Sequence, residues 1–571
     1  MNLRLFFIAC FLLGFSYSCK KTAPTPVYDI QKTAFSDAAM VVSAHPLATK
    51  VGLDVLRSGG NAVDAAIAVQ FALAVTYPVA GNIGGGGFMV IRTKEGEVAT
   101  LDFREKAPMK AHPDMYLDSL DNVIDGLSTR GHLAAGVPGT VDGMVKAYER
   151  FGQMPEFSQL VEPSVQLAKK GFKLTESQSR GLNRSRESFI ENNTSTPVFV
   201  KESGEWQPGE LLVQADLAQT LSLIRDQGRA GFYEGAVADK IVAEMEAGGG
   251  WISHEDLQAY QAQWREPIRI RYDHYEMISM PPPSSGGVAL GQLLKMVEPY
   301  PLRDWGFHAT ETTHLMVEAE RRVYADRAKH LGDSDYYPVP VQQLLDSAYL
   351  AERMASFMSD SATASAQIEA GVIAQLSESE ETTHFSVVDQ EGNAVSVTTT
   401  INGGYGCRTV VSGAGFFLNN EMDDFSMKPG VPNMFGLLGA EANKIEPEKR
   451  MLSSMTPTIV LKDGELFMVV GTPGGATIIT SVFQTILNVV EFDMSISEAV
   501  AAKRFHHQWK PEVVYAEDGA FSDSVKLELE TLGHEFKRRG SIGAVDAILV
   551  LPDGRLEGGA DPRGDDHAEG I

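Results

Sequence analysis

Hydrophobic and polar positions recur along the chain with two different periods, one typical of helices and one typical of strands. Residues 62–77 are apolar on nearly every side, Asn61 stands where it can cap a helix, and Pro78 stands where a helix would end. A helix without a polar face has to be buried, so we expect this one inside the body. Residues 130–375 show mostly helical patterns, interrupted by loops rich in Pro and Gly.

Four pairs of short strand-like runs are each joined by a turn that contains Gly, Asn or Asp. The turns are at residues 94–96, 391–393, 463–464 and 553–554. Such pairs are typical of antiparallel hairpins. Because helical segments follow these hairpins, the pattern predicts an α+β fold in which antiparallel sheets carry helices on their outer faces.

Residues 1–18 predict a secretory signal peptide. A small positive region comes first, residues 5–15 are an apolar run, and small or polar residues follow up to Cys19. The apolar run is too short to span a bilayer but fits a signal peptide. Cys19 stands where a bacterial lipoprotein is cleaved and lipidated, although Ser16 replaces the usual aliphatic residue. Ordinary cleavage after Ser18 is the alternative.

Residues 19–33 mix Lys, Pro and Thr without an apolar period, which is typical of a tether between an anchor and a folded body. We therefore expect an exported protein. We expect it to be periplasmic or anchored to the outer membrane through a lipid on Cys19, with a soluble secreted form as the alternative.

Charge and cysteine content exclude two classes of protein. The chain has 49 Lys and Arg against 75 Asp and Glu, a net charge of −26, which argues against nucleic-acid binding because phosphate contacts need a basic face. Three cysteines, Cys10, Cys19 and Cys407, are too few for a disulfide framework. We expect Cys407 to be a packed residue, because it stands alone in an apolar segment.

Three short motifs look chemical but have simpler explanations. The glycine run at residues 84–87 lacks the Lys-Ser/Thr of a phosphate loop, so we expect a tight turn or close backbone packing. His506 and His507 are adjacent and have no third ligand at metal-site spacing. Ser284 and Ser285 lack the surroundings of a nucleophile elbow, and we expect a flexible polar loop there. Neither a metal nor an organic cofactor is expected.

The segment between residues 382 and 475 brings together several groups of reactive side chains. They are Thr382-Thr383-His384 at the start of a hairpin, the acidic run Glu421-Met422-Asp423-Asp424, the hydroxyl pair Ser453-Ser454, and Gly471-Thr472-Pro473-Gly474-Gly475. With these elements the chain resembles the γ-glutamyltranspeptidase family of N-terminal nucleophile hydrolases. The resemblance extends to Leu101-Asp102-Phe103-Arg104-Glu105 and to Arg504-Phe505-His506-His507. It implies a four-layer αββα sandwich, with two stacked antiparallel sheets flanked by helices.

Members of this family are made as one inactive chain that cuts itself before a threonine, and the matching bond here joins Glu381 to Thr382. The resemblance therefore implies a large subunit of residues 34–381 and a small, catalytic subunit of residues 382–571, which form one body as a heterodimer. The cut frees an α-amino group on the threonine. With an ordinary pKa of about 8, this amine can be neutral and accept the hydroxyl proton, so cleavage creates the general base.

The resemblance also assigns residues to the recognition of a γ-glutamyl group, which carries an α-ammonium and an α-carboxylate. Arg104 matches the arginine that binds the carboxylate, since its planar guanidinium can grip both oxygens, and Ser453 and Ser454 add hydroxyl donors. The positions that match those around the ammonium are Asn402, Glu421 and Asp424.

Further matches concern the residues around the reacting atoms and the loop that covers the site. Gly474 and Gly475 match the oxyanion-hole pair, where missing Cβ atoms let backbone N–H groups approach the developing charge. Thr400 matches the threonine that orients the nucleophile. Residues 428–445 resemble a lid loop of some bacterial members, in which Phe435 replaces a common tyrosine. A phenyl ring cannot hydrogen-bond to another side chain, so we expect looser closure.

The leading hypothesis is a γ-glutamyltransferase and glutathione hydrolase. It would pass the γ-glutamyl group of glutathione and other γ-glutamyl compounds to water or to the amine of an amino acid or peptide. One alternative is an acylase for glutaryl-type (cephalosporin) amides, which lack the ammonium; the pair Glu421 and Asp424 argues against it. Another is an uncleaved lipoprotein that only binds, which the intact Thr382 and Gly474-Gly475 argue against.

Two alternatives for single residues stay open. Arg104 can be a structural ion-pair partner of Asp102 or Glu105 rather than a substrate ligand. Glu421 can face solvent while Asp424 alone holds the ammonium.

Overall fold

Two large sheets form the centre of the molecule. The computed structural model describes residues 27–369, 382–428 and 441–571, and within these ranges each large sheet has seven strands, with every pair antiparallel. The first sheet has the order β1 (Thr33–Ser36), β18 (Leu556–Ala560), β17 (Asp546–Val550), β13 (Glu465–Gly471), β12 (Thr458–Lys462), β9 (Tyr275–Ser279) and β8 (Ile268–Tyr272). The second has the order β19 (His567–Gly570), β2 (Met40–Ser43), β10 (Thr382–Val388), β11 (Ala394–Thr400), β3 (Gly86–Arg92), β4 (Val98–Asp102) and β7 (Gln263–Arg265).

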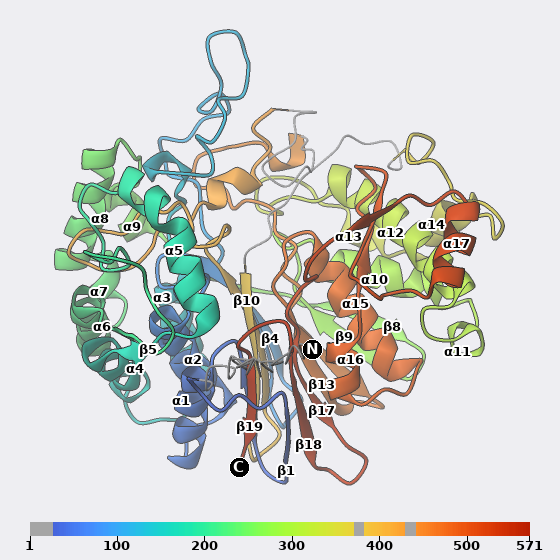
Figure 1. Cartoon of the computed structure of the whole chain (residues 1–571), viewed down its shortest axis with the longest axis horizontal. Coiled ribbons are helices and arrows are strands. Elements are labelled where there is room, and N and C mark those ends of the chain that lie inside the picture. The colour runs from blue at the N-terminus through green and yellow to red at the C-terminus, as the bar shows by residue number, and fades with distance from the viewer. Residues whose placement is uncertain (1–26, 370–381, 429–440) are drawn as a thin grey trace, which may run out of the picture.

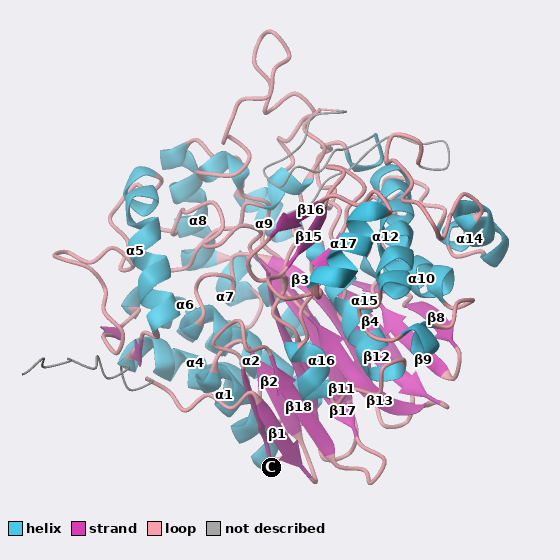
Figure 2. Ribbon diagram, turned by 45° about the vertical axis from the view of Figure 1, so that its right-hand side comes forward, coloured by secondary structure: helices cyan, strands magenta, loops and turns pink. Residues whose placement is uncertain are grey.

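Helices cover the outer face of each sheet, as Figure 1 shows with one group on each side. One group is α1 (Pro46–Arg57), α2 (Ala62–Thr76), α3 (Thr140–Phe151), α4 (Ser158–Lys170), α5 (Glu176–Glu191), α6 (Ala215–Gln227), α7 (Ala230–Tyr233), α8 (Gly235–Gly248) and α9 (His254–Ala259). The other is α10 (Gly286–Val297), α11 (Leu302–Trp305), α12 (Thr310–His330), α13 (Val341–Leu344), α14 (Ser347–Met354), α15 (Thr477–Val490), α16 (Ile496–Ala501) and α17 (Asp523–Thr531). The predicted four-layer αββα sandwich is confirmed (Figure 2).

Shorter elements complete the chain. They are the strands β5 (Phe172–Lys173), β6 (Leu211–Leu212), β14 (Phe505–His506), β15 (Val514–Ala516) and β16 (Phe536–Arg538), and the 3₁₀ helices η1 (His132–Ala134), η2 (Glu421–Asp424) and η3 (Glu441–Asn443). Among the described residues, no helix has both the length and the apolar character needed to cross a membrane.

Three large apolar clusters hold the four layers together. One joins the second sheet to helices α1–α8 and includes Phe385 and Val387, and another joins the first sheet to helices on the other side. The third fills the space between the sheets, with Val42 and Val90 from one sheet and Val469 and Ile548 from the other. Because side chains alternate along a strand, each central strand contributes to two of these clusters.

Helix α2 illustrates how local sequence fixes an element. All of its 15 residues are buried, as the apolar pattern predicted. The Asn61 side chain accepts hydrogen bonds from the Val63 and Asp64 amides, and the Asp64 carboxylate accepts one from the Asn61 amide, which makes a capping box. All four predicted hairpins are present, as β3–β4, β10–β11, β12–β13 and β17–β18.

The stretch predicted to be mostly helical also supplies edge strands to both sheets. In β8, Ile268, Ile270 and Tyr272 are buried while Arg269 and Arg271 are exposed. This alternation has the period of a strand, and it lies between long helical segments that dominate the pattern around it.

The end of the predicted tether is fixed to the body. The Lys32 ammonium donates hydrogen bonds to the backbone oxygens of Asp561, Gly564 and Asp566, at 2.7, 2.9 and 2.6 Å. The chain is therefore anchored before β1 begins. Cys19 lies outside the described residues. Cys407 is fully buried, and burial raises the pKa of its thiol to about 11, so it is the packed, unreactive cysteine that the sequence predicted.

Candidate active site

Thr382 is the first residue of β10, and its antiparallel partner is Thr400 at the end of β11. Both side chains are buried. Residues directly opposite each other in antiparallel strands point to the same face of the sheet. The threonine predicted to orient the nucleophile therefore lies beside it.

The face to which Thr382 points is the one between the two sheets. His384, two residues further along β10, packs against Gly471 at the end of β13, where a Cβ atom would lie 2.3 Å from the imidazole. Ser386 donates a hydrogen bond to the backbone oxygen of Asp546 in β17, over 3.0 Å. Since alternate residues share a face, Thr382 points the same way. Its side chain therefore faces the sheet that contains β13 and β17.

The chain between β13 and helix α15 carries Gly474 and Gly475. Their φ angles are 135° and 57°, in the region that favours glycine. Of the described residues, none accepts a hydrogen bond from either amide, while the Gly474 carbonyl accepts one from the Thr477 hydroxyl at 2.8 Å. Two amides at the N-terminus of a 14-residue helix form a suitable site for an oxyanion.

Arg104 follows β4 and is surrounded by carboxylates. Its Nη1 atom lies 2.6 Å from Glu421 Oε2 and 3.6 Å from Glu105 Oε2, and its Nη2 atom lies 2.5 Å from Asp424 Oδ2. All four side chains are buried. Backbone oxygens of Met451 and Leu452 accept further hydrogen bonds from the guanidinium.

These contacts bear on the two open alternatives. The Asp102 carboxylate pairs with Arg265 and Arg450 and accepts a backbone hydrogen bond from Arg104, so an ion pair of the Arg104 guanidinium with Asp102 is wrong. The alternative pairing of Arg104 with Glu105 is present, over 3.6 Å. Glu421 has no exposed surface, so it does not face solvent. Glu105 was foreseen only as a structural partner, and the structure adds it to the cluster at Arg104.

Burial changes the acidity of the three carboxyl groups around Arg104. It raises the pKa of Glu105 to about 8 and the pKa of Glu421 well above its ordinary value, and it raises that of Asp424 as well. The guanidinium opposes this effect, but one cation cannot offset the desolvation of three carboxylates. The cluster therefore holds protons near neutral pH, and it titrates as a unit.

Asn402 and Thr400 connect the nucleophile to this cluster. The Asn402 amide donates to the Thr400 hydroxyl at 2.7 Å, and its side chain donates to the backbone oxygen of Asn420 at 2.9 Å. Thr400 also lies close enough to the Glu421 carboxyl to oppose the rise in its pKa. Asn402 has a φ of 67°, which bends the chain away from β11 toward η2. A continuous contact path thus runs from Thr382 to the carboxylates.

Ser453 and Ser454 follow the carbonyls that bind Arg104, and both are buried. The Ser453 hydroxyl accepts a hydrogen bond from the Met455 amide, whereas the Ser454 hydroxyl has no partner among the described residues. Both serines thus directly follow the residues whose backbone oxygens bind Arg104, and their role as hydroxyl donors to the substrate stays a prediction.

The segment Ser284-Ser285 was expected to be a flexible loop, and this prediction is wrong. Both residues are fully buried. The Ser285 hydroxyl donates to the Ser453 backbone oxygen, and the Ser284 hydroxyl donates to that of Met455, each over 2.6 Å. The two hydroxyls therefore brace the segment that carries Ser453 and Ser454. The signal was the run of small residues before α10, which permits such close packing.

Several predicted residues lie outside the described ranges: Glu381, Phe435 and most of the proposed lid. The ends of the lid are described. The Asn443 side chain donates to the backbone oxygen of Asp424 at 2.6 Å and accepts from the Leu452 amide at 2.9 Å. The base of the lid is thus fixed to the carboxylate cluster.

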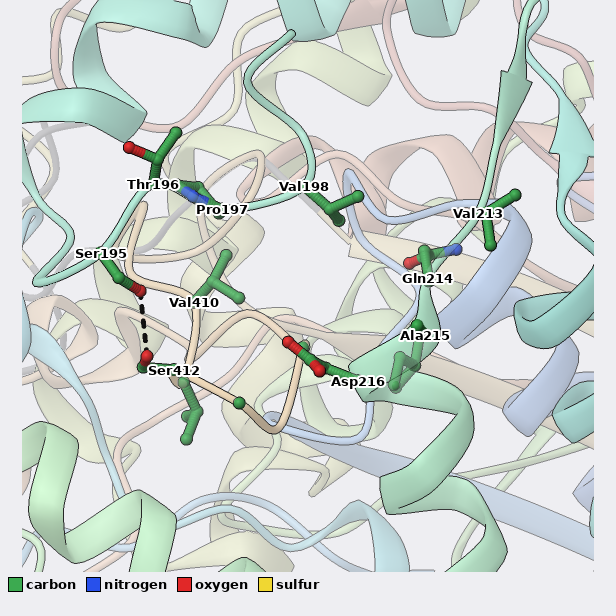
Figure 3. Close-up of a pocket in the computed structure, with 14 residues that line it drawn as sticks. Ser195, Thr196, Pro197, Val198, Val213, Gln214, Ala215, Asp216, Val410 and Ser412 are labelled. Atoms are coloured by element: carbon green, nitrogen blue, oxygen red, sulfur yellow. Dashed lines mark hydrogen bonds between the residues drawn. The ribbon is translucent and has the colours of Figure 1, made fainter. Parts of the chain in front are cut away.

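A separate pocket lies on the side of the molecule that is formed by helices α1–α9. Figure 3 shows it between the loop at residues 195–198, the start of α6 and residues 410–415, with a volume of about 170 Å³. None of the predicted site residues lines it. In the described part of the chain, no cluster of three or more His, Cys, Asp and Glu side chains is arranged to hold a metal ion.

Comparison with known proteins agrees with this geometry. The family model described as Gamma-glutamyltranspeptidase matches residues 48–571. The glutathione hydrolase proenzyme of Escherichia coli (strain K12) is 44% identical over 568 residues, which cover 98% of this chain and 97% of that protein. The glutathione hydrolase proenzyme of Pseudomonas sp. (strain A14) is 47% identical over 538 residues, covering 92% and 93%. The crystal structure of a cephalosporin acylase from Bacillus halodurans has a TM-score of 0.83 at 25% identity and covers 96% of this chain and 99% of that one.

Proposed function

Because the chain belongs to the gamma-glutamyltranspeptidase family, we propose that Thr382 is its nucleophile and that the cluster at Arg104 recognises the γ-glutamyl group. The chain is an enzyme, a γ-glutamyltransferase and glutathione hydrolase made as a proenzyme. The observation that best supports the residue assignment is the pairing of Thr382 with Thr400, which lies near the Glu421 carboxyl.

Cleavage begins when the Thr382 hydroxyl attacks the carbonyl carbon of Glu381. The acyl group moves from the Thr382 nitrogen to its oxygen, the nitrogen takes up the hydroxyl proton, and water hydrolyses the ester. This leaves a free carboxylate on Glu381 and a free α-amine on Thr382. The large-subunit product ends at Glu381 and has residues 34–381 as its predicted folded part, and the small-subunit product is residues 382–571. Both large sheets contain strands from each subunit.

In turnover the same hydroxyl attacks the γ-carbonyl of the substrate. The Thr382 α-amine accepts the hydroxyl proton and delivers it to the leaving amine. The Gly474 and Gly475 amides stabilise the oxyanion, to which such donors commonly contribute about 10² to 10³ in rate each. Water or the amine of an amino acid or peptide then attacks the ester, which regenerates Thr382.

Recognition of the α-amino acid end is an exchange of ion pairs. The substrate carboxylate takes the place of Glu421 and Asp424 at Arg104, assisted by the serine hydroxyls, and the substrate ammonium takes the place of Arg104 at the two carboxylates. Only a substrate that carries both a carboxylate and an ammonium provides a partner for Arg104 and for the two carboxylates at once. Such a substrate is needed because a buried charge without a partner is costly.

The acylase alternative is favoured by the fold shared with the cephalosporin acylase and by acylase proenzymes that are 36% identical to this chain. A glutaryl group has no ammonium and would leave Glu421 and Asp424 uncompensated.

To test the proposed function against the acylase alternative, the exported form is run on a denaturing gel, and γ-glutamyl and glutaryl anilides are assayed in parallel. Two bands with turnover of the γ-glutamyl compound are expected. A single uncut band without turnover would contradict the assignment, and preference for the glutaryl anilide would favour the acylase.

We also propose export with lipid attachment at Cys19, since residues 1–18 have the pattern of a signal peptide. Metabolic labelling with palmitate should mark the wild-type chain and not Cys19→Ser. Release of an unlabelled wild-type protein would favour the soluble form.

A further inference from the structure

A small apolar cluster, separate from the three large ones, includes a residue of η2 and packs against this turn. Its buried members come from both predicted subunits: Ala107, Ala111, Met115, Tyr116, Met422, Phe425, Met427, Ile445 and Met451. Met422 belongs to η2, and the backbone oxygen of Met451 binds Arg104. The segment that follows Arg104 therefore packs against the same turn that carries Glu421 and Asp424. In Figure 1 part of this segment projects as a loop from the top of the molecule.

One polar contact crosses this cluster. The Ser128 hydroxyl donates a hydrogen bond to Asp423 Oδ1 over 2.6 Å, and both side chains are buried. Asp423 directly precedes Asp424 and lies in the same single 3₁₀ turn. Near it, the Tyr116 hydroxyl donates to the Leu133 backbone oxygen at 2.8 Å, and the charge of Asp423 adds to burial in raising the pKa of that phenol. Of these two hydroxyls, that of Ser128 binds the buried Asp423 carboxylate and that of Tyr116 does not.

We propose that Ser128 is a positioning residue for recognition of the substrate ammonium, acting through Asp423; this inference rests on the proposed function of the carboxylate cluster. A 3₁₀ turn of four residues has few internal hydrogen bonds, so its rotation depends on outside contacts. The Ser128 bond fixes one side of the turn. Rotation of the turn would move Glu421 and Asp424 together, away from the position that the ammonium needs.

The position of the turn matters because its two carboxylates contact different nitrogen atoms of one guanidinium. Glu421 contacts Nη1 and Asp424 contacts Nη2. This arrangement sets the spacing at which a zwitterion can replace both contacts. Compounds that lack the ammonium cannot replace Arg104 at the two carboxylates, so this spacing does not strengthen their binding. Loss of the Ser128 hydroxyl should therefore weaken the binding of zwitterions selectively.

The test compares binding of glutamate and glutarate, which differ only in the ammonium group, by calorimetry on the mature enzyme. For Ser128→Ala we expect about tenfold weaker binding of glutamate, the size of one hydrogen bond to a carboxylate, and unchanged binding of glutarate. Self-cleavage and the melting temperature should stay close to wild type. The matched control is Thr129→Ala, because among the described residues the Thr129 hydroxyl bonds only to the backbone oxygen of Gly126 within the same loop. It should leave the glutamate-to-glutarate ratio unchanged.

A double-mutant cycle separates positioning from general support. If Ser128 acts through Asp423, Ser128→Ala should weaken glutamate binding no further in an Asp423→Ala background. Additive losses, equal losses for glutamate and glutarate, or an equal effect of Thr129→Ala would each overturn the proposal. Failure of the proposed function is a different result, namely a wild-type enzyme that does not hydrolyse γ-glutamyl anilides.

Discussion

The Nη1 atom of Arg104 lies 2.6 Å from the Oε2 atom of Glu421, so the groups assigned to opposite ends of the substrate contact each other in the chain without substrate. The contact is fully buried. Breaking one half of such a pair leaves a buried charge, whereas replacing both halves at once does not. Selection of an α-amino acid zwitterion follows from this relationship.

Thr382→Ala should remain a single chain and lose turnover by about 10⁴-fold or more, because both the cut and the chemistry use the same hydroxyl. A denaturing gel and an anilide assay measure the two effects. The matched control is Thr383→Val, since the Thr383 hydroxyl is buried without a partner among the described residues and lies on the opposite face of β10. Processing in Thr382→Ala would move the nucleophile elsewhere.

Arg104→Lys should raise KM for glutathione about 10- to 100-fold while self-cleavage continues, because a lysine keeps the charge but not the planar fork. Autoprocessing needs no substrate carboxylate. The gel and the steady-state assay are done on the same preparation. If KM and processing suffer together, the cause is misfolding and the assigned role is not supported.

Asp424→Asn should reduce the preference for γ-glutamyl over glutaryl anilides by about 100-fold, since sites built for one polar group reject its absence strongly. Glu421→Gln should have a smaller effect, because burial raises the pKa of Glu421 well above its ordinary value and a glutamine resembles the neutral form that this favours. The ratio of the two kcat/KM values is the measurement. An unchanged ratio in Asp424→Asn would show that the ammonium binds elsewhere.

Glutamate binding should release protons near neutral pH. Burial raises the pKa of Glu105 to about 8, from an ordinary 4.5, so the folded chain without ligand binds more protons than the unfolded chain between these values. Its stability therefore falls as pH rises through this window. A bound ammonium favours ionised carboxylates and reverses the effect. Affinity for glutamate should rise from pH 6 to pH 8, and calorimetry in buffers of different ionisation enthalpy should detect the released protons. Glutarate should show no such release.

Gly474→Ala should reduce kcat by about 10² to 10³, because the new Cβ atom would lie 2.5 Å from the Thr477 hydroxyl at a φ of 135° and would displace the amide. Gly464→Ala is the control: its φ is 87°, but it lies in the β12–β13 turn with open space around it. Equal losses in both variants would indicate a general cost of strain rather than a lost oxyanion donor.

Much of the fold was predictable because its signals are local. The cap at Asn61, the apolar length of α2 and the turns of four hairpins depend on residues close in sequence. The strands β7 to β9 were missed, because their short alternation lies between long helical segments.

The candidate site was predicted through family motifs, and its internal contacts were not. Nothing local indicates that Ser284 and Ser285 brace Ser453, or that Ser128 binds Asp423 across 295 positions of the chain. Such contacts depend on how the sheets and helices pack.

The sequence by itself determined the family, and it predicted the threonine before which the chain is cut and the residue types needed for acyl transfer. Only the tertiary structure decided which charges meet. Arg104 is 320 positions from Asp424 in sequence, and their contact exists because β4 and η2 end at the same side of the sandwich. A charge finds its partner through packing and desolvation, which no local pattern encodes.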